Sequence, residues 1–556
     1  MNANPVMLFF LRKANGLIFL SFLFFPDQSL AQFTKFWVQF TDKNSSPYTT
    51  TNPSVYLSQR SIQRRANQNI PITFYDLPVN PSYVTQVLST GNVTLNFRSR
   101  WFNAISITTS DQNALNFIAT LPFVQSVTGV GRMKRPDNFR EEEDWESYLK
   151  MQPPPNLLQV PYNYGNSFAQ ANQVNAVCLH NQGYSGQGMV IAVLDDGFRN
   201  VNTIQPFDSI RINNQILGTY DFVANSPNVY GVGGYGTQVL SCMAGYTDNQ
   251  LLITEPKAKY YLLRTENAST EFIVEEDYWV AGAEYADSVG ADIICTSLYY
   301  TTFDNPSQNH TYAQMDGKTT RCAKAAAFTA RVGMITFACA GNSGTSSWFY
   351  IGTPADADSI LAVGAVNSSG ALASFSSRGP SSDGRVKPDI CARGVSAVVC
   401  NTSGGITTAS GTSFATPICA GAAACLWQSQ PTFSAMQIRQ AIIQSSSQYL
   451  NPDSLKGYGI PNFCNASIIV GGSEISSGSH TNIFPNPAFP GSEIFFRGFE
   501  GDGLLTLTDV QGKIIFRGKI SGNTTHSIKT PEHAGLYFWT VAGTSKMVSG
   551  KLIVKD

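Results

Sequence analysis

The chain has 556 residues, which is too many for one hydrophobic core and predicts about three or four domains. Hydrophobic residues make up 43% of it and charged residues 13%, a composition typical of globular proteins that excludes an intrinsically disordered chain. The net charge of −1 indicates neither a nucleic-acid partner nor binding to an anionic membrane.

Residues 1–31 have the features of a secretory signal peptide in the expected order. Arg12 and Lys13 supply positive charge, 17–25 is a short apolar run, and 29–31 offers small residues for cleavage. A buried N-terminal strand or helix is the alternative, and it fits this order less well. The apolar run is too short to span a bilayer comfortably, and no later segment is long and apolar enough, so we expect no transmembrane segment.

All ten cysteines lie between Cys178 and Cys464. Export from the cytoplasm permits disulfides, but the sequence does not fix their pairing. Cys339 lies in an apolar, strand-like run, so buried free thiols are equally consistent with the sequence. No cysteine has the spacing of a metal ligand, so the sequence assigns no metal-ligating residue and no cofactor, and it does not decide whether calcium is bound.

Residues 33–130 predict a small α+β unit. Two stretches, 57–65 and 111–119, are compatible with helices. The strand-like runs are 36–40, 93–97, 104–108 and 124–130. Two helices among these strands favour a ferredoxin-like arrangement. The next segment, 131–160, mixes charges with a run of three consecutive prolines, 153–155, and predicts a linker that is open to proteolysis.

A Gly-Thr-Ser-Phe-Ala-Thr-Pro stretch occupies residues 411–417, and a run of small and apolar residues, 418–427, follows it. This pattern predicts a buried helix, with Ser413 near its N-terminus in the field of the helix dipole. Small neighbours would let a substrate backbone approach the hydroxyl closely. The alternative is an ordinary N-capping serine. The whole stretch resembles the nucleophile motif of the subtilases, the subtilisin-like serine peptidases.

An apolar strand-like run, 189–194, ends in Asp195-Asp196-Gly197. Open α/β sheets place their chemistry at such carboxyl ends, although an acidic pair after a strand is also a common turn. Because the run precedes residues 411–417 in the order found in subtilases, Asp195 resembles the family's triad aspartate. That resemblance implies that Asp195 would orient and stabilise an imidazolium.

The imidazole itself is missing from its place in the motif. Subtilases carry His-Gly-Thr at the start of a helix, and this chain has Tyr235-Gly236-Thr237. None of the five histidines occupies the position of the base; they are His180, His310, His480, His526 and His533. A phenol has a pKa of about 10, so Tyr235 would donate a hydrogen bond to Ser413 but would not readily take its proton. The sequence therefore predicts severely impaired triad catalysis.

Two further motifs resemble subtilase motifs. Asn342, in Gly-Asn-Ser-Gly, matches the oxyanion-hole asparagine. Ser297, Leu298 and Tyr299 match the substrate-binding strand, except that the family usually has glycine where Tyr299 stands. The tyrosine would either narrow the cleft or point elsewhere, and the sequence leaves both open.

The resemblance implies a three-layer α/β domain with a parallel sheet over residues 161–465, in which Asp195, Tyr235 and Ser413 converge at one sheet edge. Residues 33–130 lie between the signal peptide and this domain, and in that position they resemble a subtilase propeptide. Such a propeptide would assist folding and cap the cleft. An ordinary structural domain is the alternative for that unit.

A Gly/Ser-rich linker, 466–481, is expected before a small β-sandwich, 482–556. The strand-like runs of the sandwich are 493–496, 504–508, 513–517, 535–541 and 551–554. Its Pro-Asn-Pro start and Lys-Leu-Ile-Val ending resemble a type IX secretion sorting domain, with a generic binding module as the alternative. The resemblance implies the type IX machinery as a partner and a secreted or cell-surface location.

Two functions remain open. The first is a secreted serine endopeptidase that acts on protein or peptide substrates and is strongly impaired because Tyr235 replaces the base. The second is an inactive pseudoprotease that serves as a secreted binding or scaffold protein.

Overall fold

The computed structural model describes residues 33–132, 163–252, 254, 256–471, 482–497, 502–510, 513–521, 525–543 and 547–555. The predicted signal peptide and nearly all of the predicted linker 131–160 lie outside these ranges. Among the described residues, no helix is both long and apolar enough to cross a membrane.

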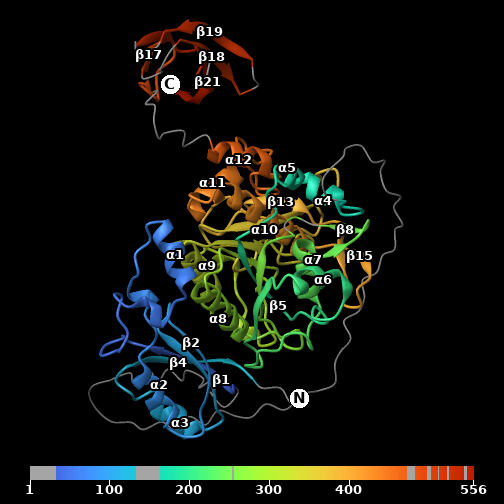
Figure 1. Ribbon diagram of the computed structural model, residues 1–556. Coiled ribbons are helices and arrows are strands. Elements are labelled where there is room, and N and C mark those ends of the chain that lie inside the picture. Colours follow the sequence, from blue (N-terminus) through green and yellow to red (C-terminus); the bar gives the residue numbers. More distant parts are fainter. Residues whose placement is uncertain are drawn as a thin grey trace, which may run out of the picture.

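The N-terminal unit is an antiparallel four-stranded sheet with two helices on one face (Figure 1). In order across the sheet, the strands are β2 (Thr94–Ser99), β3 (Ala104–Thr108), β1 (Lys35–Phe40) and β4 (Val124–Gly131). The helices are α2 (Pro81–Leu88) and α3 (Gln112–Ile118). This order is ferredoxin-like, as predicted.

One helix of this unit was not predicted. α2 begins with Pro81 after Asn80, whose side chain accepts a hydrogen bond from the Ser82 amide and caps the helix. The predicted helix at 57–65 exists as α1 (Gln59–Asn67), but it contacts α8 of the main domain and does not belong to the core of the unit's own sheet.

The main domain is built on a seven-stranded sheet in which every neighbouring pair is parallel. The strands in spatial order are β13 (Ile390–Arg393), β12 (Leu361–Val366), β11 (Ile335–Cys339), β10 (Ile293–Thr296), β5 (Val190–Asp195), β9 (Lys259–Arg264) and β6 (Ile216–Asp221). β5 is an interior strand of the sheet, and its burial on both faces explains its unbroken apolar sequence.

Helices cover both faces of this sheet, so the domain has the predicted three layers (Figure 1). Alternate residues of β5 face opposite cores: Ile191 packs with α7 and α10, and Ala192 packs with α8 and α9. The helices are α4 (Phe168–Gln173), α5 (Ala176–Asn181), α6 (Asp208–Ile212), α7 (Tyr235–Ala244), α8 (Val274–Val289), α9 (Arg321–Arg331), α10 (Thr412–Ser429), α11 (Ala435–Gln444) and α12 (Phe463–Gly471). Short paired strands complete the domain: β7 (Tyr246–Thr247) with β8 (Leu251–Leu252), and β14 (Ala397–Cys400) with β15 (Ile406–Ala409).

The end of the domain differs from the sequence prediction. Helix α12 runs through Gly471, so it includes the first residues of the predicted linker 466–481. A disulfide between Cys178 and Cys464 ties α12 to α5. The other eight cysteines are buried free thiols.

The N-terminal unit packs on α8 and α9 of the main domain. Trp37, Phe97 and Trp101 belong to the same apolar cluster as these two helices. Three arginines of the unit, Arg64, Arg65 and Arg100, also pair with one fully buried carboxylate of α8, Asp287. The interface therefore combines an apolar core with a buried ionic network.

The C-terminal unit is a small β-sandwich, as predicted. Its strands are β16 (Asn482–Phe484), β17 (Glu493–Arg497) and β20 (His526–Lys529) in one sheet, and β19 (Ile514–Ile520), β18 (Gly503–Asp509), β21 (Gly535–Gly543) and β22 (Met547–Val554) in the other. Leu505, Trp539 and Ile494 lie in the core between the two sheets.

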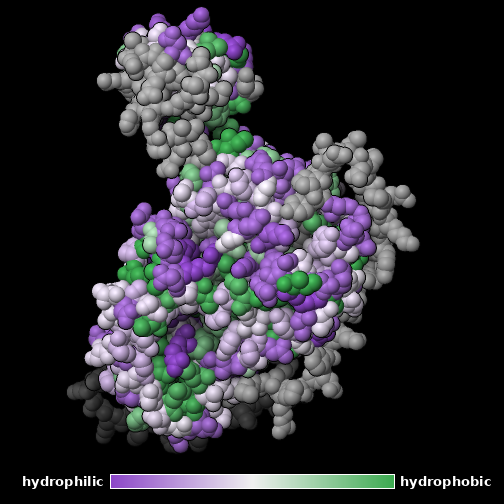
Figure 2. Space-filling model, viewed as in Figure 1, coloured by the Kyte–Doolittle hydropathy of each residue, from purple (hydrophilic) through white to green (hydrophobic). Residues whose placement is uncertain are grey.

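Over the face of the molecule in Figure 2, hydrophilic residues are interspersed with hydrophobic ones.

Candidate active site

Asp195 is the last residue of β5 and is fully buried. Its Oδ1 accepts a hydrogen bond of 2.9 Å from the Asp196 amide, whereas its Oδ2 has no hydrogen-bond partner among the described residues. Burial raises the pKa of the Asp195 carboxyl well above its usual value, and the neighbouring Asp196 charge raises it further. A donor aimed at Oδ2, which an imidazole would supply, is what this carboxylate lacks.

Asp196 fixes the start of α7, a role that the sequence analysis missed. Its Oδ1 accepts hydrogen bonds from the amides of Tyr235 and Gly236, each 3.1 Å long, and its Oδ2 accepts from the Gly234 amide at 3.3 Å. A carboxylate at a helix N-terminus pairs with the free amides and the positive end of the dipole. The only sequence signal was the acidic pair itself, because the helix that it caps lies about forty residues further on.

Tyr235 begins α7 and directs its phenol at the nucleophile. Its ring packs on that of Phe414, with centroids 5.5 Å apart, and its phenol lies close enough to the Ser413 side chain to interact with it electrostatically. A Cβ placed on Gly411 would lie 3.4 Å from the Tyr235 hydroxyl, which puts the phenol beside the nucleophile loop. Burial raises the pKa of Tyr235 above its usual value, so the phenol is protonated at neutral pH.

Ser413 is the second residue of α10 and is 3% exposed. Its Oγ donates to the Ser297 carbonyl at 3.3 Å, and the Ser297 Oγ donates to the Ser413 carbonyl at 2.8 Å. The second bond has a clear cause. Pro417, four residues on, has no N–H to give to the Ser413 carbonyl, so this buried acceptor takes its hydrogen bond from Ser297.

Removing the Ser297 hydroxyl should therefore destabilise the main domain. We expect Ser297→Ala to lower its free energy of unfolding by about 1–3 kcal/mol, because the buried Ser413 carbonyl is left without a donor. Urea denaturation would measure the change, and Ser307→Ala, at an exposed position, is the control. Equal stability of Ser297→Ala and wild type would show that the Ser413 carbonyl does not depend on this bond.

Asn342 follows β11 and is held by the residue before the nucleophile. Its Oδ1 accepts from the Thr412 amide at 2.9 Å and from the Thr412 Oγ1 at 3.0 Å. With its oxygen engaged, the amide turns its Nδ2 toward Gly411, where an added Cβ would lie 3.5 Å away. Asn342 thus presents an N–H donor beside Ser413, as an oxyanion hole requires.

Tyr299 lies over the loop that carries Asn342. A Cβ added at Gly341 would lie 3.1 Å from the Tyr299 ring, and the Tyr299 hydroxyl is 3.3 Å from the Ser343 hydroxyl. Leu298, beside it, is 9% exposed. The Tyr299 ring therefore packs against the loop that carries Asn342.

The histidines of the main domain are engaged elsewhere. The His180 Nε2 lies 2.7 Å from the Thr254 carbonyl, and burial lowers the pKa of this ring. His310 lies in a polar stretch of sequence, but its side chain is buried against Phe303 and pairs with Glu276. Of the other three, His480 lies outside the described residues, and His526 and His533 belong to the C-terminal unit.

The geometry thus gathers Ser413, Asn342, Asp195 and Tyr235, and among the described residues no histidine joins them. A protonated phenol can donate a hydrogen bond but cannot readily take the proton of a serine hydroxyl. With a phenol pKa at or above about 10, no more than about one part in 10³ is phenolate at pH 7.

Comparison with known families agrees with this arrangement. Residues 186–459 match the subtilase family model, and residues 35–144 match the model of the peptidase S8 propeptide domain of Bacteroidota. Residues 482–555 match a secretion-system C-terminal sorting domain. The predicted propeptide-like unit and sorting domain are therefore confirmed, and the sorting domain indicates secretion and a cell-surface location.

Several curated subtilisins are similar to the main domain. Subtilisin amylosacchariticus of Bacillus subtilis subsp. amylosacchariticus is 31% identical over 307 residues, which are 54% of this chain and 72% of the relative. Subtilisin DY of Bacillus licheniformis is 31% identical, with 54% and 96% covered. Subtilisin Savinase of Lederbergia lenta is 32% identical, with 52% and 95% covered. The chain belongs to the subtilase family.

Proposed function

We propose that this protein is a secreted subtilase whose hydrolysis of peptide bonds is strongly impaired because Tyr235 occupies the position of the general base. One observation carries the proposal. The Tyr235 phenol interacts with Ser413 at the position that a catalytic imidazole would occupy, and the Asp195 Oδ2 has no hydrogen-bond donor among the described residues. The three side chains at the triad position are therefore close together, but the phenol already carries its proton and cannot accept the proton of Ser413.

The remaining groups have the roles expected of an acyl-transfer site. Ser413 is the nucleophile, and the Asn342 amide would stabilise the negative charge that develops on the substrate oxygen. Ser297, Leu298 and Tyr299 form the strand along which a protein or peptide substrate would lie. The Asn342–Thr412 hydrogen bonds support this assignment because they fix the amide orientation before any substrate arrives.

A pseudoprotease that acts as a secreted binding or scaffold protein is the second candidate. The raised pKa of Asp195 favours it, because this site favours the neutral carboxyl, and only the charged form would stabilise an imidazolium that a substrate brought. The ordered Asn342 favours the first candidate, since an idle site has no need of an oriented donor.

The other units complete the proposal. Residues 33–130 would act as a propeptide that assists folding and caps the cleft of the 161–465 domain. Residues 482–556 would engage the type IX secretion machinery, after removal of residues 1–31 as a signal peptide. The segments 131–160 and 466–481 would join these units.

Impaired catalysis predicts that the protein does not process itself. Purified without other proteases, the chain should keep its N-terminal unit over hours, because cleavage between residues 132 and 160 would need an active Ser413. Intact-mass spectrometry over time measures this directly.

The controls are Ser413→Ala, which cannot cleave at all, and Tyr235→His, which should release the N-terminal unit. Rapid cleavage of the wild type that disappears in Ser413→Ala would contradict the proposal, because it would show a working site with Tyr235 in place. An added protease that cuts the wild type and Ser413→Ala equally would show that the segment is accessible.

A further inference from the structure

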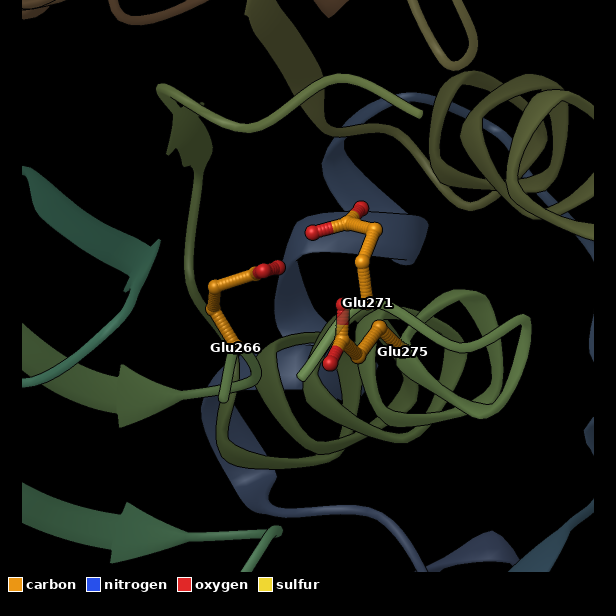
Figure 3. A group of neighbouring side chains, drawn as sticks. All are labelled: Glu266, Glu271 and Glu275. Atoms are coloured by element: carbon orange, nitrogen blue, oxygen red, sulfur yellow. The ribbon is translucent and has the colours of Figure 1, made fainter. Parts of the chain in front are cut away.

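Three glutamates gather at the same sheet edge as Asp195, outside the candidate triad. Glu266 lies just after β9, the neighbour of β5, and Glu275 lies in the first turn of α8. Glu271 is in the loop between them. Figure 3 shows the Glu266 carboxylate extending toward the other two. One carboxylate oxygen from each residue lies within 4.8 Å of one from each of the others.

Glu275 is the least expected member of this cluster. It is 0% exposed, and neither of its carboxylate oxygens has a hydrogen-bond donor among the described residues. A buried carboxylate without donors costs several kcal/mol unless a proton or a cation compensates it. The charges that raise the pKa of Glu275 most are those of Glu266 and Glu271, which are also acidic.

Two cations attract the cluster electrostatically, but among the described residues neither forms an ion pair with it. Arg264 forms its ion pair with Asp221 at 2.9 Å, and the Lys35 ammonium donates to the Tyr278 hydroxyl. A fourth carboxylate, Asp304, adds negative charge at the rim, where its Oδ2 accepts from the Glu271 amide at 3.3 Å. Burial, followed by the other acidic side chains, raises the pKa of Glu271 to about 8, which reflects the same lack of positive charge.

We propose that Glu266, Glu271 and Glu275 bind a divalent cation of the calcium type. Calcium takes six to eight oxygen ligands at about 2.3–2.6 Å, so ligand oxygens on opposite sides of the ion lie up to roughly 5 Å apart. The cluster meets that limit without rearrangement. Glu266 and Glu271 are half-buried, so water can reach the ion and complete its shell, whereas Glu275 closes the inner side.

The ion would hold the substrate-binding strand through one hydrogen bond. The Tyr300 hydroxyl donates to the Glu266 Oε2 at 3.1 Å, and Tyr300 directly follows Tyr299. The same ion would fix the 266–275 loop, on which the end of the N-terminal unit rests: a Cβ added at Gly131 would lie 2.9 Å from Val274. This inference does not depend on whether Ser413 hydrolyses peptides.

Terbium luminescence and calcium calorimetry test the site on the full-length protein. After treatment with a chelator, the wild type should bind one Ca²⁺ per chain by calorimetry at this cluster. It should also sensitise Tb³⁺ emission from its aromatic residues, and Ca²⁺ should abolish that emission by competition. Glu275→Gln should weaken Ca²⁺ binding by about ten-fold or more, because it removes one of the three charged ligands. Glu493→Gln, at an exposed carboxylate of the C-terminal unit, should bind as the wild type does.

Melting temperatures of the variants, with and without Ca²⁺, distinguish a Ca²⁺ ligand from a residue that only stabilises the fold. In chelator, Glu275→Gln should melt no lower than the wild type, because it relieves repulsion between like charges. In Ca²⁺, only the wild type and Glu493→Gln should gain thermal stability. The proposal is overturned if the wild type binds no Ca²⁺, which would mean that protons alone compensate the cluster. It is also overturned if Glu275→Gln binds Ca²⁺ as tightly as the wild type.

Discussion

Replacing Tyr235 with histidine should raise kcat/KM for peptide hydrolysis by about 10²- to 10⁴-fold, the usual contribution of a positioned general base. The imidazole would lie between two groups that are already in place. It would donate to the Asp195 Oδ2, which has no hydrogen-bond partner in the part of the chain that the structure describes, and accept the proton of the Ser413 hydroxyl. In subtilisin, losing the histidine costs about 10⁶ in kcat, so the gain is expected to be partial.

Two controls separate base catalysis from relief of crowding. Tyr235→Phe removes the phenol hydroxyl without adding a base, and it should leave hydrolysis at the wild-type level. The double variant Tyr235→His with Asp195→Asn should lose the gain. Activity of Tyr235→His should rise with pH as its imidazole loses a proton near a pKa of about 6.5. If Tyr235→His folds but hydrolyses no faster than Tyr235→Phe, the missing base is not what limits this site.

Asp287→Asn should lower the free energy of unfolding of the docked N-terminal unit by about 3–5 kcal/mol. Asp287 is 0% exposed and is the shared partner of Arg64, Arg65 and Arg100, with two hydrogen bonds of 2.8 Å from Arg65 alone. An amide cannot balance three buried guanidinium groups, so the loss exceeds that of a single hydrogen bond. Hydrogen exchange in α1 and urea denaturation would both report it.

The matched control is Asp383→Asn, which breaks the half-exposed pair with Arg385 and should change stability by less than about 1 kcal/mol. The pH dependence has a definite sign. Burial alone would raise the pKa of Asp287, but Arg65, Arg100 and Arg64 overcome it and hold that pKa well below its usual range. The contribution of Asp287 is therefore present above its unfolded pKa of about 3.9 and is lost only as pH falls through the lower folded value. Equal acid sensitivity of Asp287→Asn and wild type would contradict this account.

The sequence alone was enough to locate the site residues that follow a strand or begin a helix. Residues 189–194 are apolar throughout because β5 is covered on both faces, and that continuity located Asp195 at its carboxyl end. The small-residue run after Ser413 likewise reflects burial of α10 beneath the sheet.

The contacts that sequence reasoning missed join residues far apart in the chain. Asp196 caps a helix about forty residues away, and the Ser297 hydroxyl replaces the N–H that Pro417 lacks. His310 has a polar sequence neighbourhood, yet it is buried because Glu276 of α8 offers it a partner. No local pattern carries such information, because each residue is ordinary until the sheet brings its partner near.

Labelling with a fluorophosphonate probe tests most directly whether Ser413 is activated, because the probe reports nucleophilicity without requiring a matched substrate. Wild type, Tyr235→His and Ser413→Ala would be labelled under identical conditions at neutral pH, with the modified residue located by mass spectrometry. The account predicts very slow labelling of the wild type, fast labelling of Tyr235→His at Ser413, and none of Ser413→Ala. Fast, stoichiometric labelling of wild-type Ser413 would contradict it, since the serine would then be activated with Tyr235 at the position of the base.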